Sequence, residues 1–180
     1  MKPKKICVVI TARPSYSRVK SLLSAVLENP KLELQLVVAA SALLDRYGKV
    51  EDTIKNDGFQ VAARVHMVLE GDDPIVMSKT TGIGILQLST VFSSIEPDVV
   101  LTIADRYETM ATAIAATYMN IPLVHIQGGE VTGSIDERVR HSITKLADFH
   151  FPSTAMAEKR IIRTNIHFPD PLPISSCSLT

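Results

Sequence analysis

The sequence predicts an α/β fold with a doubly wound parallel sheet whose two faces are covered by helices. Short apolar runs rich in Val and Ile, typical of strands buried on both faces, alternate with longer stretches whose apolar residues recur at helical spacing. The connections between them are only a few residues long, which favours right-handed strand-helix-strand units. With 180 residues, the chain is long enough for one ordinary domain and too short for two.

Six strands are expected where apolar and β-branched residues run together. The third run alternates between apolar and polar residues more than the others do, so its strand is expected nearer an edge of the sheet. The expected strands cover residues 6–10, 34–40, 59–68, 99–103, 121–124 and 148–152.

Helix boundaries are expected at capping residues, prolines and glycines. After the first strand, Ser15 is a candidate N-cap and Pro30 lies beyond the helix end. Residues 41–48 are interpreted as a connecting loop, and either Ser153 or Thr154 is expected to cap the last helix. The other helices are expected over residues 50–57, 73–94, 110–118, 134–147 and 154–163.

The longest of these helices has a defined start and an unusual interior. Asp73 is its expected N-cap and Pro74 its first residue. Gly82 and Gly84 lie inside it, where each glycine costs up to about 1 kcal/mol relative to Ala. Two glycines at these positions indicate either close packing or close approach of a ligand.

Composition excludes several classes of protein. The formal net charge is +0, without a basic run or an acidic tail, which argues against nucleic acid or a membrane surface as partner. No span approaches the roughly 20 apolar residues of a transmembrane helix. Cys7 and Cys177 lack metal-ligand spacing and are interpreted as reduced thiols of a cytoplasmic protein. We therefore expect neither a metal nor a cofactor.

Three polar loops follow predicted strands and should meet at one rim of the sheet, because parallel strands end at the same edge. They span residues 11–18, 104–107 and 125–136. The rim would combine guanidinium groups suited to phosphate with carboxylates suited to proton transfer. In particular, Arg13, Asp105 and Glu130 are expected to gather in one cavity.

The chemistry of each loop leaves a choice open. Arg13 and Arg18 could hold a phosphate at a helix N-terminus, although no G-x-G-x-x-G motif is present. Asp105 could cap the following helix, act in catalysis, or do both. The loop of residues 125–136 could be a tight turn with solvated side chains or a site of proton transfer.

The helix after the third loop shows three patterns. Ser134 and Glu137 fit a capping box. A buried stripe is predicted for Ile135, Val139, Ile143, Leu146 and Ala147. A second face is basic, and it could be either solvated or a site for anionic substrate groups; it is made of Arg138, His141 and Lys145.

The order and spacing of these blocks resemble the N-terminal lobe of the hydrolysing UDP-N-acetylglucosamine 2-epimerases, over about residues 4–163. The matching runs are TARPSYS at residues 11–17, DRYE at 105–108, HIQGGEVTG at 125–133, Asp136, and RVRHSITKLA at 138–147. The resemblance implies a Rossmann-like lobe of a two-lobed, glycosyltransferase-B-like (GT-B-like) enzyme of sialic acid or legionaminic acid precursor synthesis. It also implies a homo-oligomer, a dimer or a tetramer.

The family reaction eliminates UDP across C1 and C2 of the sugar and then adds water to the glycal, which releases N-acetylmannosamine. The resemblance implies catalytic positions at Asp105, Gln127, Glu130 and Asp136. It implies substrate-binding positions at Arg13, Tyr16, Ser17, Arg18, His125, Arg140 and His141.

The chain departs from the family pattern at three places. Ala104 stands where Gly is usual, and Gln127 stands where many members carry a catalytic Glu. Because an amide cannot act as a base, Glu130 or Asp136 would take that role, or the substrate would be a diacetamido-trideoxy sugar nucleotide. A second lobe is expected to be absent, and residues 164–180 are expected to form an irregular tail. The lone lobe could therefore be a non-catalytic binding or oligomerising remnant.

Overall fold

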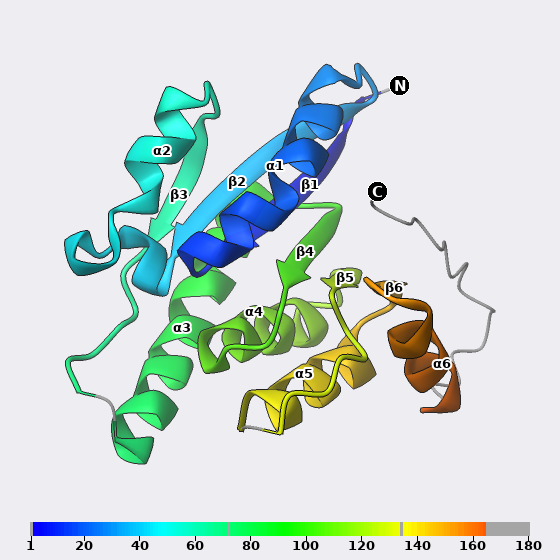
Figure 1. The fold of residues 1–180 in the computed structure, drawn as a ribbon. Helices are drawn as coiled ribbons and strands as arrows, with labels where there is room; N and C mark the ends of the chain where they lie inside the picture. The colour runs from blue at the N-terminus through cyan, green and yellow to red at the C-terminus, as the bar shows by residue number, and fades with distance from the viewer. Residues whose placement is uncertain (1, 72, 134, 165–180) are drawn as a thin grey trace.

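The structure, a computed structural model, describes residues 2–71, 73–133 and 135–164. Its centre is a six-stranded parallel sheet with the order β3-β2-β1-β4-β5-β6 (Figure 1). The chain starts in the middle of the sheet, builds one half outward, and then returns to build the other half. The predicted doubly wound parallel sheet is therefore confirmed. The strands are β1 (Lys4–Ile10), β2 (Leu32–Ala39), β3 (Val61–Val65), β4 (Val99–Ile103), β5 (Leu123–Ile126) and β6 (Phe149–Phe151).

Helices cover both faces of this sheet. Alternate residues of β1 divide between two apolar clusters, with Val8 and Ile10 packed against α1 and α2, and Cys7 and Val9 packed on the side of α3, α4 and α5. Figure 1 shows α1 lying across β1 and β2, and α2 beside β3. The helices are α1 (Arg13–Glu28), α2 (Val50–Asn56), α3 (Pro74–Ile95), α4 (Tyr107–Tyr118), α5 (Ile135–Leu146) and α6 (Ala155–Arg163).

Most element boundaries agree with the sequence patterns, and β4 covers the predicted residues. Two predicted caps are confirmed: Asp73 Oδ1 accepts from the amide of Ile75 at 2.7 Å, and Thr154 Oγ1 accepts from the amide of Ala157 at 3.1 Å. The third strand is shorter than predicted but lies at the edge, as expected. The predicted loop at residues 41–48 contains two short 3-10 helices, Ala40–Leu43 and Asp45–Tyr47.

Two expectations about the helices were wrong, and a third was confirmed at only one of its two positions. Ser15 is buried inside α1 and is not its N-cap, because Pro14 allows the helix to begin at Arg13. Ile135 is exposed at the start of α5, so it does not belong to the buried stripe. Of the two glycines in α3, only Gly84 packs closely, since a Cβ there would overlap side-chain atoms of Met67.

By length and composition, α3 is able to cross a membrane, and it is the one such helix among the described residues. The expectation that no span approaches that length was therefore wrong by this criterion. The helix nevertheless packs along α4, and one side of it enters the core of the lobe. Its buried residues are Thr80, Gly84, Leu88 and Phe92. These contacts account for the apolar residues on one side of the helix, whereas Ile75 and Leu86 remain exposed.

Two predictions fall on residues outside the described part of the chain. Ser134 of the capping box is one, and the irregular tail, apart from Thr164, is the other. Glu137, the second residue of the box, accepts from the amides of Thr132 at 3.1 Å and Gly133 at 2.6 Å. Its side chain therefore closes the turn that leads into α5.

Candidate active site

A cavity of about 420 Å³ lies at the carboxyl ends of β4 and β5, where two of the predicted loops meet α1. In a doubly wound sheet, ligands bind at this edge, near the point where the strand order reverses between β1 and β4. The charged and amide side chains that line it are Arg18, Asp105, Gln127, Glu130 and Arg140. It therefore collects residues from four separate parts of the sequence.

Arg140 and Asp105 form an ion pair at the wall of this cavity. Arg140 reaches from α5, where it is buried, and its guanidinium donates both to the Asp105 carboxylate and to the main-chain oxygen of Glu130 at 2.7 Å. The alternative in which Asp105 caps α4 is wrong, because Arg106 occupies the N-cap position and that helix end has no side-chain cap. Burial, together with the nearby charge of Arg18, lowers the pKa of Arg140.

Arg18 and Gln127 join α1 to the loop after β5. One guanidinium nitrogen of Arg18 donates to the side-chain oxygen of Gln127 at 2.9 Å. Gln127 has a φ of 64°, in the left-handed region that side chains other than glycine rarely adopt. The Gln127 side chain thus holds the guanidinium of Arg18 at the cavity wall.

Glu130 and Asp136 occupy different surroundings. Glu130 lines the cavity, and its carboxylate accepts from the Thr154 hydroxyl at 3.1 Å. Asp136 does not line it and lies instead near Arg106. Burial lowers the pKa of Arg106. The ion pair with Glu108 and the negative charge of Asp136 raise this pKa by more, so that it lies above its usual value. The structure therefore places Asp105 and Glu130 in one cavity, whereas Asp136 lies outside the residues that line it.

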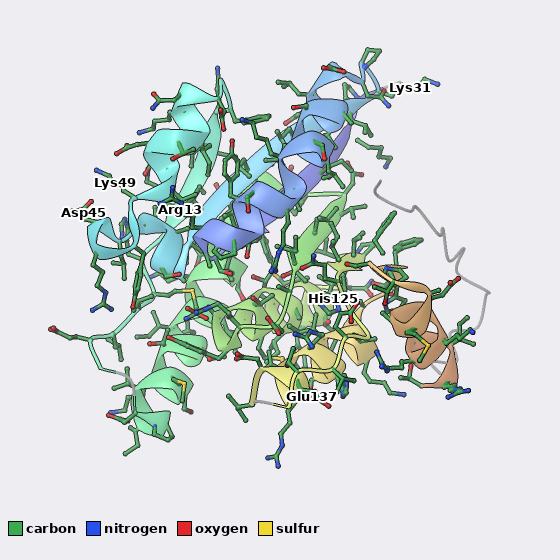
Figure 2. The ribbon with its side chains drawn as sticks, viewed as in Figure 1. Arg13, Lys31, Asp45, Lys49, His125 and Glu137 are labelled. Carbon is green, nitrogen blue, oxygen red and sulfur yellow. The ribbon has the colours of Figure 1, made fainter. Side chains whose placement is uncertain are left out.

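Arg13 does not line the cavity, so this part of the sequence prediction was wrong. Its guanidinium lies against Gly48, where an added Cβ would be 2.9 Å from one of its nitrogens. Figure 2 shows Arg13 near Asp45 and Lys49. Arg18, one and a half turns further along α1, supplies the guanidinium at the cavity instead.

Tyr16 and Ser17 also make contacts within the fold rather than at the cavity. The buried Tyr16 donates its hydroxyl to Asp57 at 2.5 Å and packs edge-to-face on Phe59. Burial and the neighbouring carboxylate raise the pKa of Tyr16. Ser17 donates to the main-chain oxygen of Pro14 at 3.0 Å. The first predicted loop therefore contributes mainly to the packing of α1.

His125 is wholly buried beneath the cavity and does not line it. Its Nε2 lies 2.9 Å from the main-chain oxygen of Ala104, and its Nδ1 lies 3.2 Å from the Thr144 hydroxyl. Burial lowers the pKa of His125 to about 4, so the ring is neutral at pH 7. His125, labelled in Figure 2, therefore contacts the main chain beside Asp105 and not the cavity itself.

His141 lies on the exposed side of α5 and lines two other cavities. One is shared with Arg138, and the other with Lys145 and Arg160. Lys145 donates to the main-chain oxygen of Thr164. The basic face of this helix is therefore separate from the cavity that contains Asp105.

The paired glycines of the third loop are explained by packing against helices. A Cβ on Gly128 would lie 2.8 Å from the Thr144 hydroxyl, and a Cβ on Gly129 would overlap the main-chain oxygen of Ala157 in α6. Gly129 also has a φ of 78°. Sequence reasoning missed Thr144 and Thr154. Thr144 could have been found from its spacing of four residues from Arg140, which places both on one side of α5.

Within the described part of the chain, no group of three or more His, Cys, Asp or Glu side chains is arranged to hold a metal ion. The sequence prediction that the protein uses no metal or cofactor stays a prediction.

The strand order and the covering helices define the class of protein: a Rossmann-like α/β lobe of the GT-B-like type. The sequence model of the UDP-N-acetylglucosamine 2-epimerase family matches residues 24–170. The chain belongs to that family, which confirms the resemblance seen in its motifs.

Several characterised relatives align with most of the chain. It is 37% identical over 160 residues to a UDP-N,N'-diacetylbacillosamine 2-epimerase (hydrolyzing) of Legionella pneumophila, which covers 89% of this chain and 42% of the relative. It is 32% identical to a GDP/UDP-N,N'-diacetylbacillosamine 2-epimerase (hydrolyzing) of Campylobacter jejuni, covering 91% and 42%. Identity to a UDP-N-acetylglucosamine 2-epimerase of Neisseria meningitidis is 29%, covering 89% and 42%. The chain thus spans less than half the length of these relatives.

Solved structures show the same fold. A crystal structure of a UDP-N-acetylglucosamine 2-epimerase superposes with a TM-score of 0.81 at 23% identity, covering 92% of this chain and 44% of the other. The Neisseria meningitidis enzyme bound to UDP-N-acetylglucosamine gives a TM-score of 0.78 at 19% identity, covering 91% and 43%.

Proposed function

We propose that this chain is the N-terminal lobe of a hydrolysing 2-epimerase that acts on a UDP-linked 2-acetamido sugar. The proposal rests on the cavity in which the carboxylates of Asp105 and Glu130 lie with the guanidinium groups of Arg18 and Arg140. Elimination across C1 and C2 needs both kinds of group, a base near C2 and positive charge near the departing phosphate oxygen.

The proposed reaction has two steps. A carboxylate takes the proton from C2, the electron pair of that bond forms the C1–C2 double bond, and the C1–O bond breaks to release UDP. Water then adds across the double bond and gives the free sugar with inverted configuration at C2. Asp105 and Glu130 are the candidate bases that line the cavity, and Asp136 is a third candidate beside it. Gln127 cannot act as a base, and we assign it the role of holding Arg18.

Two sugars fit the proposal. N-acetylglucosamine is the substrate implied by the family as a whole. The identities of 37% and 32% to relatives named for N,N'-diacetylbacillosamine, against 29% to one named for N-acetylglucosamine, favour the diacetamido sugar. Gln127 in place of the more usual Glu supports the same choice.

The proposed catalysis requires a second lobe, because the groups that react must be held from both sides of the substrate. Residues 1–163 would form the folded lobe, and the cavity would be one wall of the cleft. The alternative is that the chain works without turnover, as a lobe that binds the nucleotide sugar or associates with other subunits.

An exposed apolar surface supports the further proposal that the protein forms homo-oligomers. Along α3, Ile75 is 66% and Leu86 is 73% exposed, and Tyr118 at the end of α4 is 88% exposed. The helix carries a single charged side chain, Lys79. If this surface joins two copies, Leu86→Lys should lower the mass measured by light scattering.

The test of the proposed function compares UDP, UDP-N-acetylglucosamine and UDP-N,N'-diacetylbacillosamine. Binding to the chain is measured by NMR, and turnover is measured as release of UDP and the free sugar from the chain alone and fused to the C-terminal lobe of the Legionella relative. We expect binding by the chain and turnover by the fusion, abolished in Asp105→Asn. Binding by the chain without turnover by a folded fusion would favour the non-catalytic alternative. Absence of both would refute the proposal.

A further inference from the structure

Five residues around the floor of the cavity form a closed ring of contacts. The His125 ring contacts the main-chain oxygen of Ala104 at 2.9 Å, and the next residue, Asp105, is paired with Arg140. The main-chain oxygen of Arg140 accepts from the Thr144 hydroxyl at 2.9 Å. That hydroxyl lies 3.2 Å from the second ring nitrogen of His125. The ring of contacts therefore starts and ends at the histidine.

Burial makes these contacts persistent. His125 is fully buried, and Ala104, Arg140 and Thr144 are buried beside it. A buried polar group that loses its partner is destabilising, because no water replaces the lost hydrogen bond. Rotation of the imidazole would leave the oxygen of Ala104 and both ring nitrogens without their present partners.

Proton counting fixes the direction of one bond. A main-chain oxygen can only accept, so Nε2 of His125 must carry the proton and donate to Ala104. In the neutral ring, Nδ1 is then an acceptor that faces the Thr144 hydroxyl. The bond to Ala104 is thus the contact that a replacement residue must reproduce.

The bond to Ala104 acts on a strained turn. Ala104 has a φ of 68°, a left-handed conformation that is unfavourable for a residue with a Cβ. Such conformations persist where the surroundings hold them. The amide of Ala104 donates to Ile126 at 3.1 Å and its oxygen accepts from His125, so both of its main-chain polar groups are held by β5. The turn determines the direction in which the following residue, Asp105, leaves the sheet.

Gly128 provides the room that the ring of contacts needs. An added Cβ would lie 2.8 Å from the Thr144 hydroxyl and 3.0 Å from Nδ1 of His125. Both distances are too short for ordinary contact, so a side chain there would separate the two partners. The first glycine of the pair therefore leaves room for the Thr144 hydroxyl to lie against Nδ1 of His125.

We propose that His125 is a positioning residue, which does not touch the substrate but holds the Ala104 turn so that the carboxylate of Asp105 meets Arg140. The importance of this for catalysis rests on the proposed function, whereas the positioning itself can be measured in the folded chain. The imidazole acts on Asp105 indirectly, through its hydrogen bond to the main-chain oxygen of Ala104.

The test follows the guanidinium resonances of Arg140 by ¹⁵N NMR, because a buried ion pair slows rotation of the group and separates its N–H signals. His125→Phe removes the donor and keeps a ring, whereas His125→Gln keeps an N–H near the Nε2 position. We expect the separated signals to be lost in the first variant and kept in the second. The matched control is His150→Phe, which removes a buried imidazole on β6, opposite His125 in register, that makes no bond to Ala104.

A folded His125→Phe variant with unchanged Arg140 signals would overturn the proposal, and so would loss of the signals in His150→Phe. If His125→Phe does not fold, the same measurement is made on Thr144→Val, which lacks the hydroxyl. Thr144→Ser, which keeps the hydroxyl, is its control. We expect at least threefold faster rotation of the Arg140 guanidinium in the valine variant, and an unchanged rate would overturn the proposal. None of these measurements depends on turnover, so the proposed function can fail without affecting their outcome.

Discussion

Acid should destabilise this lobe through His125 at a higher pH than through Glu51. Burial lowers the pKa of His125 from 6.5 to about 4 in the folded chain. The unfolded chain therefore binds a proton at a pH where the folded chain does not. The resulting stability is fully present above pH 6.5 and is lost as the pH falls toward 4.

The size of the effect follows from the two pKa values. The full difference of about 2.5 units corresponds to about 3.4 kcal/mol below pH 4, and about 2 kcal/mol of it is already lost at pH 5. Hydrogen bonds to Arg64 and Lys55 lower the pKa of Glu51 from 4.5 to about 2, so its contribution is lost only as the pH falls below 4.5.

The assay is urea unfolding at pH 7 and pH 5, followed by circular dichroism. We expect the free energy of unfolding to fall by about 2 kcal/mol in the native sequence and by much less in His125→Gln, which does not titrate in this range. Burial also lowers the pKa of His150, so His150→Phe is measured in parallel to separate its share. Equal stability at both pH values, or an undiminished loss in His125→Gln, would refute the reasoning.

Three further predictions test other features. Ala104→Gly should raise the free energy of unfolding by up to about 1 kcal/mol in urea, because glycine adopts the left-handed turn without strain. Gly129→Ala should lower it by about 2–4 kcal/mol, whereas Gly133→Ala, also at positive φ but in open space, should cost only about 1 kcal/mol; equal losses would contradict the packing argument. Arg18→Gln should weaken UDP binding about tenfold in calorimetry, as expected for one lost charge-assisted contact, and Arg13→Gln should weaken it less. The reverse order would restore the sequence-based assignment.

The fold was largely predictable because its signals are local. The buried strand Val99–Ile103 and the Asp73 cap each depend on a few neighbouring residues. The boundary at Ser15 was missed because Pro14 fits the first turn and allows the helix to begin at Arg13, so that Ala12 is the N-cap. The exposed position of Ile135 was missed because the apolar stripe of α5 begins only at its second turn.

The site was predictable in part. The expectation that the loops after β4 and β5 meet follows from parallel strands alone, and it placed Asp105 and Glu130 correctly. The choice between Arg13 and Arg18 depends on the rotation of α1 about its axis, which the sequence does not define. The role of His125 depends on whether its side chain is buried, which the sequence does not define. A histidine close to two glycines is compatible with a residue that contacts a ligand and with a buried residue that holds the loop in place.

The last described helix is firmly attached to the loop that carries a candidate base. Arg160 of α6 donates to the main-chain oxygen of Gly129 at 3.1 Å, Thr154 binds the carboxylate of Glu130, and the main chains of Gly129 and Ala157 lie in direct contact. Because α6 holds the main chain of Gly129 and the N-terminal Thr154 cap holds the Glu130 carboxylate, a shift of this helix would displace the candidate base with it.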